Sequence, residues 1–234
     1  MSVTRARAPR APQYPRKRRP PPVRGPKRRT PTARIAVAAA AVVVLVVLAL
    51  VVAVSRGSSK LSTAVPASLP GELTGPAPWP ANTGQLRARL DTLGLPALAV
   101  EGEVLHIHQH LDLYVDGRHV PVAPGIGIDP SGFFYSPLHT HDVSGVIHVE
   151  SQTVRRFTLG ELFGVWGVRF RNGCLGGYCA GGGNVLRVYV NGRRLTGDPG
   201  QLRLAPHQEI VVAYGTPRQV ASHVPVSYDF PPGE

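Results

Sequence analysis

The histidines are the residues of this chain with the clearest capacity for chemistry. All nine lie between positions 106 and 223, and six of them fall in two short segments, HIHQH and HTHDVSGVIH. Neutral imidazole nitrogen is a preferred donor for Zn²⁺ and Cu²⁺, and His-x-His on a β-strand places two rings on one side. The pattern predicts a transition-metal site, zinc or copper, whose ligands are a subset of His106, His108, His110, His139, His141 and His148.

The spacing limits how many of these rings can bind one ion. His106 and His110 lie about 13 Å apart along an extended strand, so we expect two ligands from the first segment and two or three from the second. Asp112 and Glu150 fall on the same predicted faces and are expected to accept hydrogen bonds from ligand rings or to supply an oxygen ligand. Three histidines with an open position would activate water, whereas four closed ligands suit structure or storage, and the spacing does not choose between them.

The remaining histidines have simpler explanations. His119 is predicted to lie opposite Tyr114, which offers an ordinary packing partner and makes a ligand role the weaker explanation. His207 and His223 are isolated, and we expect them to be structural. No nucleotide-binding loop, nucleophile elbow or catalytic triad pattern accompanies them, so the sequence assigns no catalytic residue.

Two hairpins are expected to position the histidine segments. Residues 105–115 alternate apolar and polar, and Asp116-Gly117 favours a tight turn that pairs Tyr114 with His119. In the second segment, a turn at 142–145 would pair His139 with His148. That register places His139, His141, His148 and Glu150 on one face.

Other local patterns complete the predicted domain. Residues 85–93 are typical of a short amphipathic helix capped by Asn82 or Thr83 and ended by Gly94, and Thr158 begins a capping box for a second helix that ends at Gly167. Residues 186–196 predict a third hairpin, and 208–214 a last strand. The fold class is therefore mainly β: antiparallel hairpins forming a small sheet, sandwich or barrel, with one or two short helices.

The two cysteines lie in a Gly-rich loop as Cys174-Leu-Gly-Gly-Tyr-Cys179. An even count with no other partners favours a disulfide, which requires an oxidising compartment. Copper ligation by two thiolates is the alternative. The four-residue spacer differs from the Cys-x-x-Cys motif of thioredoxin-like proteins and argues against redox catalysis.

The N-terminal residues predict a membrane anchor. Residues 35–54 hold no charged or polar side chain, Pro or Gly, and a helix of that length spans the roughly 30 Å hydrocarbon layer. Twelve basic residues and no acid precede this segment, which puts the N-terminus in the cytoplasm and the rest outside the plasma membrane. A cleavable signal is the alternative, although its apolar region is usually shorter.

Charge and composition divide the chain further. The basic tail accounts for the whole net charge of +12, because the 14 later bases balance 14 acids, and this excludes a nucleic-acid-binding role for the folded domain. The tail is expected to be disordered and to attract anionic lipid headgroups, or to dock a cytoplasmic partner. The predicted organisation is tail 1–34, transmembrane helix 35–54, Pro/Ser/Gly-rich stalk 55–81, extracytoplasmic β domain 82–216 and C-terminal tail 217–234.

Several segments together resemble a family of uncharacterised bacterial membrane-anchored or secreted proteins. They are HIHQHLDLYVDG, PGIGI, SPLHTHDVSGVIHVES, FTLGELFGVWGV, CLGGYC and VYVNG, which cover about residues 100–216. The resemblance implies domain boundaries and an extracytoplasmic location, and it implies no activity.

Three functions follow from the sequence. The first is a single-pass anchored domain that binds copper or zinc for metal handling. The second is a metal-dependent hydrolase that uses the same histidines with an open coordination position. The third is a cell-envelope interaction module without a metal, whose histidines form a pH-sensitive surface.

Overall fold

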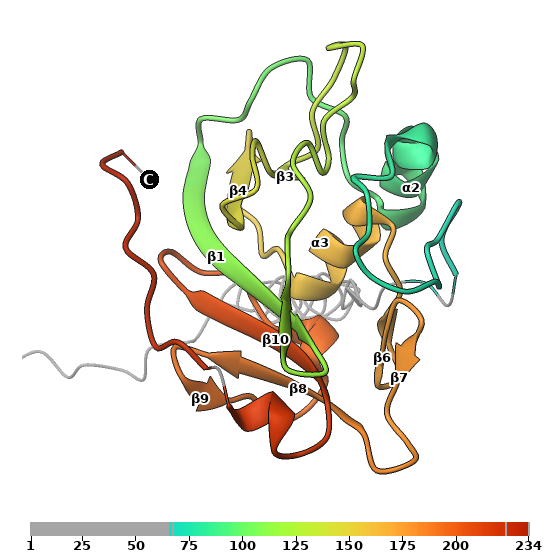
Figure 1. Ribbon diagram of the computed structural model, residues 1–234. Coiled ribbons are helices and arrows are strands. Elements are labelled where there is room, and N and C mark those ends of the chain that lie inside the picture. Colours follow the sequence, from blue (N-terminus) through green and yellow to red (C-terminus); the bar gives the residue numbers. More distant parts are fainter. Residues whose placement is uncertain (1–65, 67, 223, 234) are drawn as a thin grey trace, which may run out of the picture. The chain divides into compact units, whose positions relative to one another are not determined.

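The long strand β1 (Leu105–Val115) lies inside the main sheet. The computed structural model describes residues 66, 68–222 and 224–233, in which the strand order is β3-β4-β1-β10-β8-β9, with β2 also paired to β1 (Figure 1). The fold is mainly β, as predicted. The other strands of this sheet are β2 (Arg118–Val120), β3 (Leu138–His139), β4 (Val146–Ser151), β8 (Val185–Val190), β9 (Arg193–Arg194) and β10 (Glu209–Gly215).

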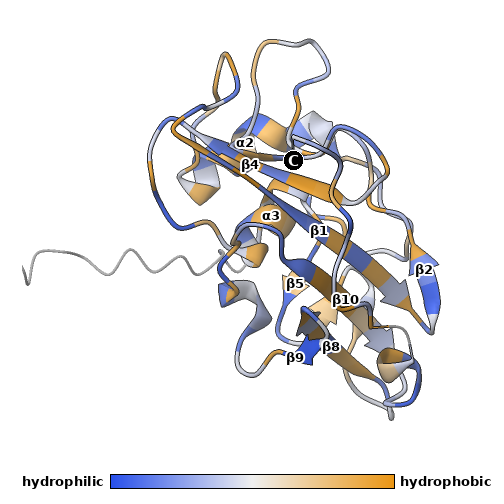
Figure 2. Ribbon diagram, turned by 90° about the vertical axis from the view of Figure 1, so that its left-hand side faces the viewer, coloured by the Kyte–Doolittle hydropathy of each residue, from blue (hydrophilic) through white to orange (hydrophobic). Residues whose placement is uncertain are grey.

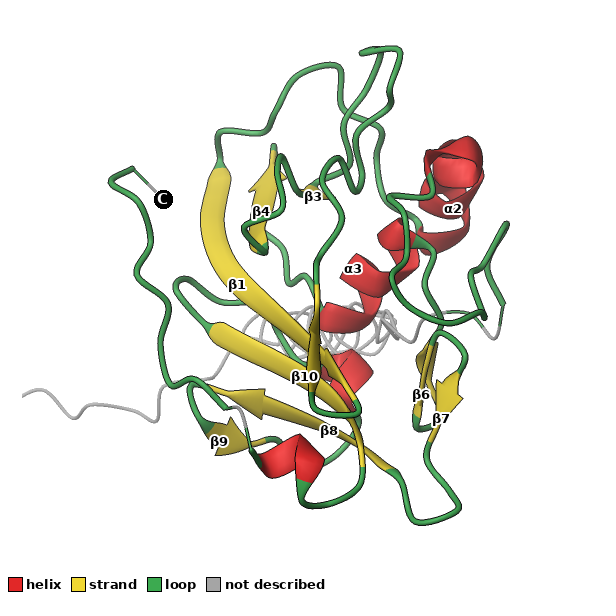
Figure 3. Ribbon diagram, viewed as in Figure 1, coloured by secondary structure: helices red, strands yellow, loops and turns green. Residues whose placement is uncertain are grey.

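The two faces of the sheet differ in chemistry. Leu111 and Leu113 of β1 point into the core, and the intervening polar residues face the other side, so hydrophobic and hydrophilic residues alternate along the strand (Figure 2). The helices α2 (Leu86–Leu93) and α3 (Leu159–Trp166) contribute side chains to the same hydrophobic core as the apolar face of the sheet (Figure 3). The opposite face is therefore left for the histidines.

The predicted hairpin registers are confirmed. Tyr114 pairs with His119, and His139 pairs with His148. The turn between β1 and β2 has positive φ at Asp116 and Gly117, as a tight hairpin turn with the twist of the strands requires. The antiparallel pairing of β1 with β4, which sets His108 opposite His148, brings the two histidine segments to one face.

Two features of the sheet were not predicted. β1 pairs with β10 in parallel, whereas only antiparallel hairpins were expected. Hairpin signals identify neighbours along the chain, and β1 and β10 are joined by the rest of the domain. A second sheet of three strands, β5 (Phe170–Arg171), β6 (Cys174–Leu175) and β7 (Tyr178–Cys179), consists of strands too short to show an alternating pattern.

The predicted cap of α2 is wrong, although its C-terminal end is as expected. A short 3₁₀ turn, η1 (Thr83–Gln85), precedes α2, and neither helix has a side-chain cap. Asn82 instead donates a hydrogen bond from Nδ2 to the carbonyl of Gly71, 2.9 Å away. Gly94 ends α2 in the left-handed conformation. Two further 3₁₀ turns are η2 (Pro199–Gln201) and η3 (Gln219–Ala221).

Residues 68–81, expected to belong to an exposed stalk, pack against the domain. Leu69 and Trp79 are buried. The fully buried Arg89 of α2 donates hydrogen bonds to the carbonyls of Pro70, Asn82 and Val165, which joins this segment to α3, and burial lowers the pKa of Arg89 to about 10. The folded domain therefore begins earlier than the sequence pattern indicates.

The predicted basic tail and membrane segment lie outside the described residues. Within the part of the chain that the structure describes, no helix combines the length and apolar character needed to cross a bilayer. The anchor remains a sequence-based prediction.

The capping box of α3 is confirmed. Thr158 Oγ1 accepts a hydrogen bond from the Glu161 backbone N–H (3.2 Å), and the Glu161 carboxylate accepts one from the Thr158 N–H (2.8 Å). Thr158→Ala should lower the free energy of unfolding by about 1 kcal/mol, because the buried backbone N–H of Glu161 loses its partner. Urea denaturation measures this loss. The exposed Thr153→Ala serves as a control that should change stability by less than about 0.5 kcal/mol, and equal effects would contradict the capping role.

Candidate metal centre

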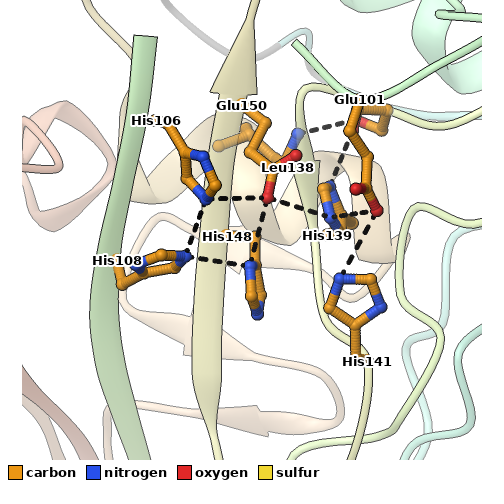
Figure 4. A network of polar contacts seen from close by, with 9 residues as sticks. Glu101, His106, His108, Leu138, His139, His141, His148 and Glu150 are labelled. Atoms are coloured by element: carbon orange, nitrogen blue, oxygen red, sulfur yellow. Dashed lines mark hydrogen bonds and ion pairs between the residues drawn. The ribbon is translucent and has the colours of Figure 1, made fainter. Parts of the chain in front are cut away.

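Strand pairing brings the histidines of β1, β3 and β4 into rows. His106 lies opposite Glu150, while His108 and His139 both lie opposite His148, one from each side. Directly opposed residues share a face of the sheet. Three strands thus present one group of imidazoles around Glu150, with His141 following β3 (Figure 4).

The first set of donors is His106, His108, His148 and Glu150. The Nε2 atoms of His106 and His108 are 3.2 Å apart, and His108 Nε2 lies 3.1 Å from His148 Nδ1. Glu150 Oε1 is 3.3 Å from both His148 Nδ1 and His106 Nε2. All four donor atoms lie within 4.8 Å of one another, close enough to hold one metal ion.

The second set shares His148 and Glu150 with the first and adds His139 and His141. His139 Nε2 is 3.8 Å from Glu150 Oε1. Glu101, in the loop before β1, places Oε1 3.7 Å from His139 Nε2 and 3.6 Å from His141 Nε2. The sequence pattern did not identify Glu101, because a loop carries no alternation that would give the direction of its side chain.

The His139 ring is oriented so that Nε2, with a free lone pair, faces Glu101 and Glu150. The ring is fully buried, and burial lowers its pKa to about 4, so it is neutral at physiological pH. Nδ1 lies 3.1 Å from the carbonyl oxygen of Ser136, which can only accept, so Nδ1 carries the proton. Nε2 is therefore unprotonated, and it has no hydrogen-bond partner among the described residues. A ring oriented by a backbone carbonyl is the usual state of a histidine ligand.

Two further groups are in the form that metal binding requires. The pKa of His108 falls to about 4 because the ring is buried, and the neighbouring His148 and His106 lower it further. Burial of Glu150 alone would raise its pKa, but the hydrogen bond from His148 and the surrounding histidines lower it. Neutral imidazoles around an ionised carboxylate are the protonation states of metal ligands.

His110 lies in a different group, with Asp112 and Glu209. Its Nδ1 contacts Glu209 Oε2 at 2.7 Å, its Nε2 contacts the Ser144 carbonyl at 2.8 Å, and Tyr228 stacks on the ring. Burial opposes the charged ring, but the Glu209 hydrogen bond and charge raise the pKa of His110. Both ring nitrogens of His110 contact groups other than the remaining histidines, so this ring does not belong to the group around Glu150.

Asp112, predicted to support the metal site, instead contacts His119 Nε2 at 3.1 Å. Asp112 lies four residues, about 13 Å, along the strand from His108. It is therefore too far from the group around Glu150, which consists of His106, His108, His139, His141 and His148. Glu150 lies among the rings themselves, as the prediction of an oxygen ligand allowed.

The other histidines are placed as follows. The His119 ring packs against Tyr114, as the predicted pairing implied. The His207 ring packs against Phe230, and its backbone N–H donates to the His108 carbonyl. His223 lies outside the described residues.

Cys174 and Cys179 form the predicted disulfide, which links β6 and β7. Their sulfurs are bonded to each other, so the alternative of copper ligation by two thiolates is not supported. Among the described residues, the candidate metal site offers nitrogen and oxygen donors only.

The burial of His139 predicts that the metal-free protein loses stability in acid. The folded-state pKa of about 4 lies below the ordinary value of 6.5, so between these values the unfolded chain binds a proton that the folded chain does not. As the pH is lowered through this range, His139 should reduce the free energy of unfolding by up to about 1.4 kcal/mol per pH unit. Urea denaturation in the presence of a chelator at pH 7, 6 and 5 measures the slope.

His139→Asn, whose amide can still donate to Ser136, should show a smaller loss of stability between pH 7 and 5. His119→Ala, on the exposed edge strand β2, should retain the wild-type slope. Identical slopes for all three proteins would contradict the role of His139.

Comparisons of this chain with protein-family models, curated proteins and solved structures find no significant match. The resemblance drawn from the sequence segments therefore remains untested, and the function rests on the site itself.

Proposed function

We propose that this protein binds a transition-metal ion, zinc or copper, through His106, His108, His148 and Glu150, and that it serves metal handling. The observation that carries the proposal is the spacing of the donor atoms. A tetrahedral ion with ligands at 2.0–2.1 Å separates them by about 3.3 Å. Four of the six donor separations in this set are between 3.1 and 3.3 Å.

The donor set favours zinc or copper over other ions. Three imidazoles with one carboxylate suit Zn²⁺ and Cu²⁺, whereas Mg²⁺ and Ca²⁺ prefer oxygen ligands. Thiolates, which would select Cu⁺, are missing from the set.

The position of the site supports exchange of the ion. The site lies on the face of the sheet opposite the hydrophobic core, which has its own extensive packing. The side chain of His106 is half exposed, and an open depression lined by His106, His108 and His207 adjoins it. An ion reached from solvent in this way can be acquired and released, as metal handling requires.

The same exposure supports a second candidate function, metal-dependent hydrolysis. Solvent access would let water complete the coordination of the ion, and a metal-bound water ionises near neutral pH. The coordination number of the bound ion, measured by X-ray absorption, separates the two functions: a bound water supports hydrolysis, and four protein ligands support handling.

The proposed location is the extracytoplasmic face of the plasma membrane. Residues 35–54 would anchor the domain, and the basic tail would lie against anionic lipid headgroups in the cytoplasm. The disulfide between Cys174 and Cys179 supports this location, because such bonds persist in oxidising compartments.

The experiment is elemental analysis of the full chain, purified in detergent without chelator and then dialysed against zinc or copper. We expect stoichiometric metal in the wild type, a lower content in His106→Ala, and an unchanged content in His119→Ala. Both substituted side chains are about half exposed, which makes them matched in their effect on folding. No stoichiometric metal in the wild type would overturn the proposal and favour the interaction module without a metal.

A further inference from the structure

The centre holds more donors than one tetrahedral ion uses. Beyond the first set, His139 and His141 lie on the other side of His148 and Glu150, and Glu101 lies against both of them (Figure 4). His139 in particular is fully buried, and no hydrogen bond within the described residues uses its Nε2. A buried polar atom without a partner is costly, and its retention requires an explanation.

We infer that the centre binds two metal ions that share Glu150, the second held by His139, His141 and Glu101. This inference rests on the proposed function of the first set. It assigns a ligand role to Glu101, and it makes Glu150 a bridging carboxylate between the two ions.

The distances around the second position fit this assignment. Glu101 Oε1 is 3.6 Å from His141 Nε2 and 3.7 Å from His139 Nε2, and Glu150 Oε1 is 3.8 Å from His139 Nε2. These separations are a few tenths of an ångström above the roughly 3.3 Å of a tetrahedral ion, a difference that small side-chain rotations remove. The side chain of Glu101 is 44% exposed and has the freedom to make this adjustment.

Charge also favours a second carboxylate here. One buried carboxylate, Glu150, offsets part of the charge of one divalent ion. A second ion beside the first would be repelled unless another anion lay close to it. Glu101 provides that anion on the side of His139 and His141, away from His106 and His108.

The stoichiometry and affinity of zinc test the inference in the full chain. Wild type should bind two zinc ions, measured by elemental analysis and by competition with a chromophoric chelator. Glu101→Gln and His141→Ala should each reduce the count to one, as should His106→Ala from the other side. His119→Ala should keep two, and far-UV circular dichroism should be the same for all variants.

Cu²⁺ gives an independent readout. Two Cu²⁺ ions that share a carboxylate lie close enough for their unpaired electrons to couple, so the electron paramagnetic resonance signal of the loaded wild type should be weaker than the copper content implies. His141→Ala should restore the uncoupled signal of a single ion.

The outcomes separate this inference from the proposed function. One ion in the wild type, lost in His106→Ala and retained in Glu101→Gln and His141→Ala, would overturn the second position and leave the first intact. Two ions that survive both Glu101→Gln and His141→Ala would place the second ion elsewhere and overturn the inference. No bound ion would overturn both proposals.

Discussion

Replacement of Glu150 with glutamine is expected to lower the zinc affinity of the full chain by more than about 100-fold. Loss of a group that only orients a metal ligand typically costs 10–100-fold, and Glu150 is itself a proposed ligand. Its carboxylate contacts His106, His139 and His148. The amide of glutamine has nearly the same shape but no charge, so the change removes the anionic donor without emptying a buried site.

Competition with a chromophoric zinc chelator measures this loss. Glu103→Gln is the matched control, because it removes the same charge from an exposed residue near the start of β1. The control should bind zinc within about twofold of the wild type. Wild-type affinity in Glu150→Gln would show that any bound ion lies elsewhere, and it would overturn the proposed site whether one ion or two are bound.

The part of this site that could be predicted from the sequence depends on contacts close along the chain. Asp116-Gly117 sets the pairing of β1 with β2, and the turn at 142–145 sets the pairing of His139 with His148. Each turn fixes a register, and each register decides which side chains share a face. The grouping of His139, His141, His148 and Glu150 followed from these local signals.

The parts that could not be predicted depend on contacts between distant segments. The parallel pairing of β1 with β10 places Glu209 beside His110 and so separates this ring from the other five. Glu101 reaches the centre from a loop. Hydrophobic periodicity describes neither the order of strands from distant parts of the chain nor the direction of a loop side chain.

The segment before η1 shows a third limit, because its composition resembles that of an exposed linker. Residues 68–81 are rich in Pro and Gly and hold few large apolar side chains. Composition describes an average, whereas burial depends on single residues: Trp79 belongs to the core, and Leu73 and Ala77 of the same segment pack against it.

Trp79→Ala should lower the free energy of unfolding by about 3–5 kcal/mol, the usual cost of removing a large aromatic side chain from a core. Trp79 is 4% exposed, and its ring meets those of Trp166 and Tyr178 edge-on at 6.1 and 6.2 Å. Trp79 Nε1 donates a hydrogen bond to the Gly75 carbonyl. The substitution would leave a cavity beside Trp166 of α3 and Tyr178 of β7, and Gly176, which packs closely against the Trp79 ring, has no side chain to fill it.

Urea denaturation of the full chain in detergent, followed by far-UV circular dichroism, measures this change. The control is Val143→Ala, whose side chain is 65% exposed in the turn before β4, and it should alter stability by less than about 0.5 kcal/mol. Equal stability of Trp79→Ala and the control would mean that residues 68–81 form an exposed stalk, as their composition suggests. A large loss confined to Trp79→Ala would make this segment part of the domain that positions the metal centre, because Trp79 packs on Trp166 of α3, and α3 in turn contacts β3, which carries His139.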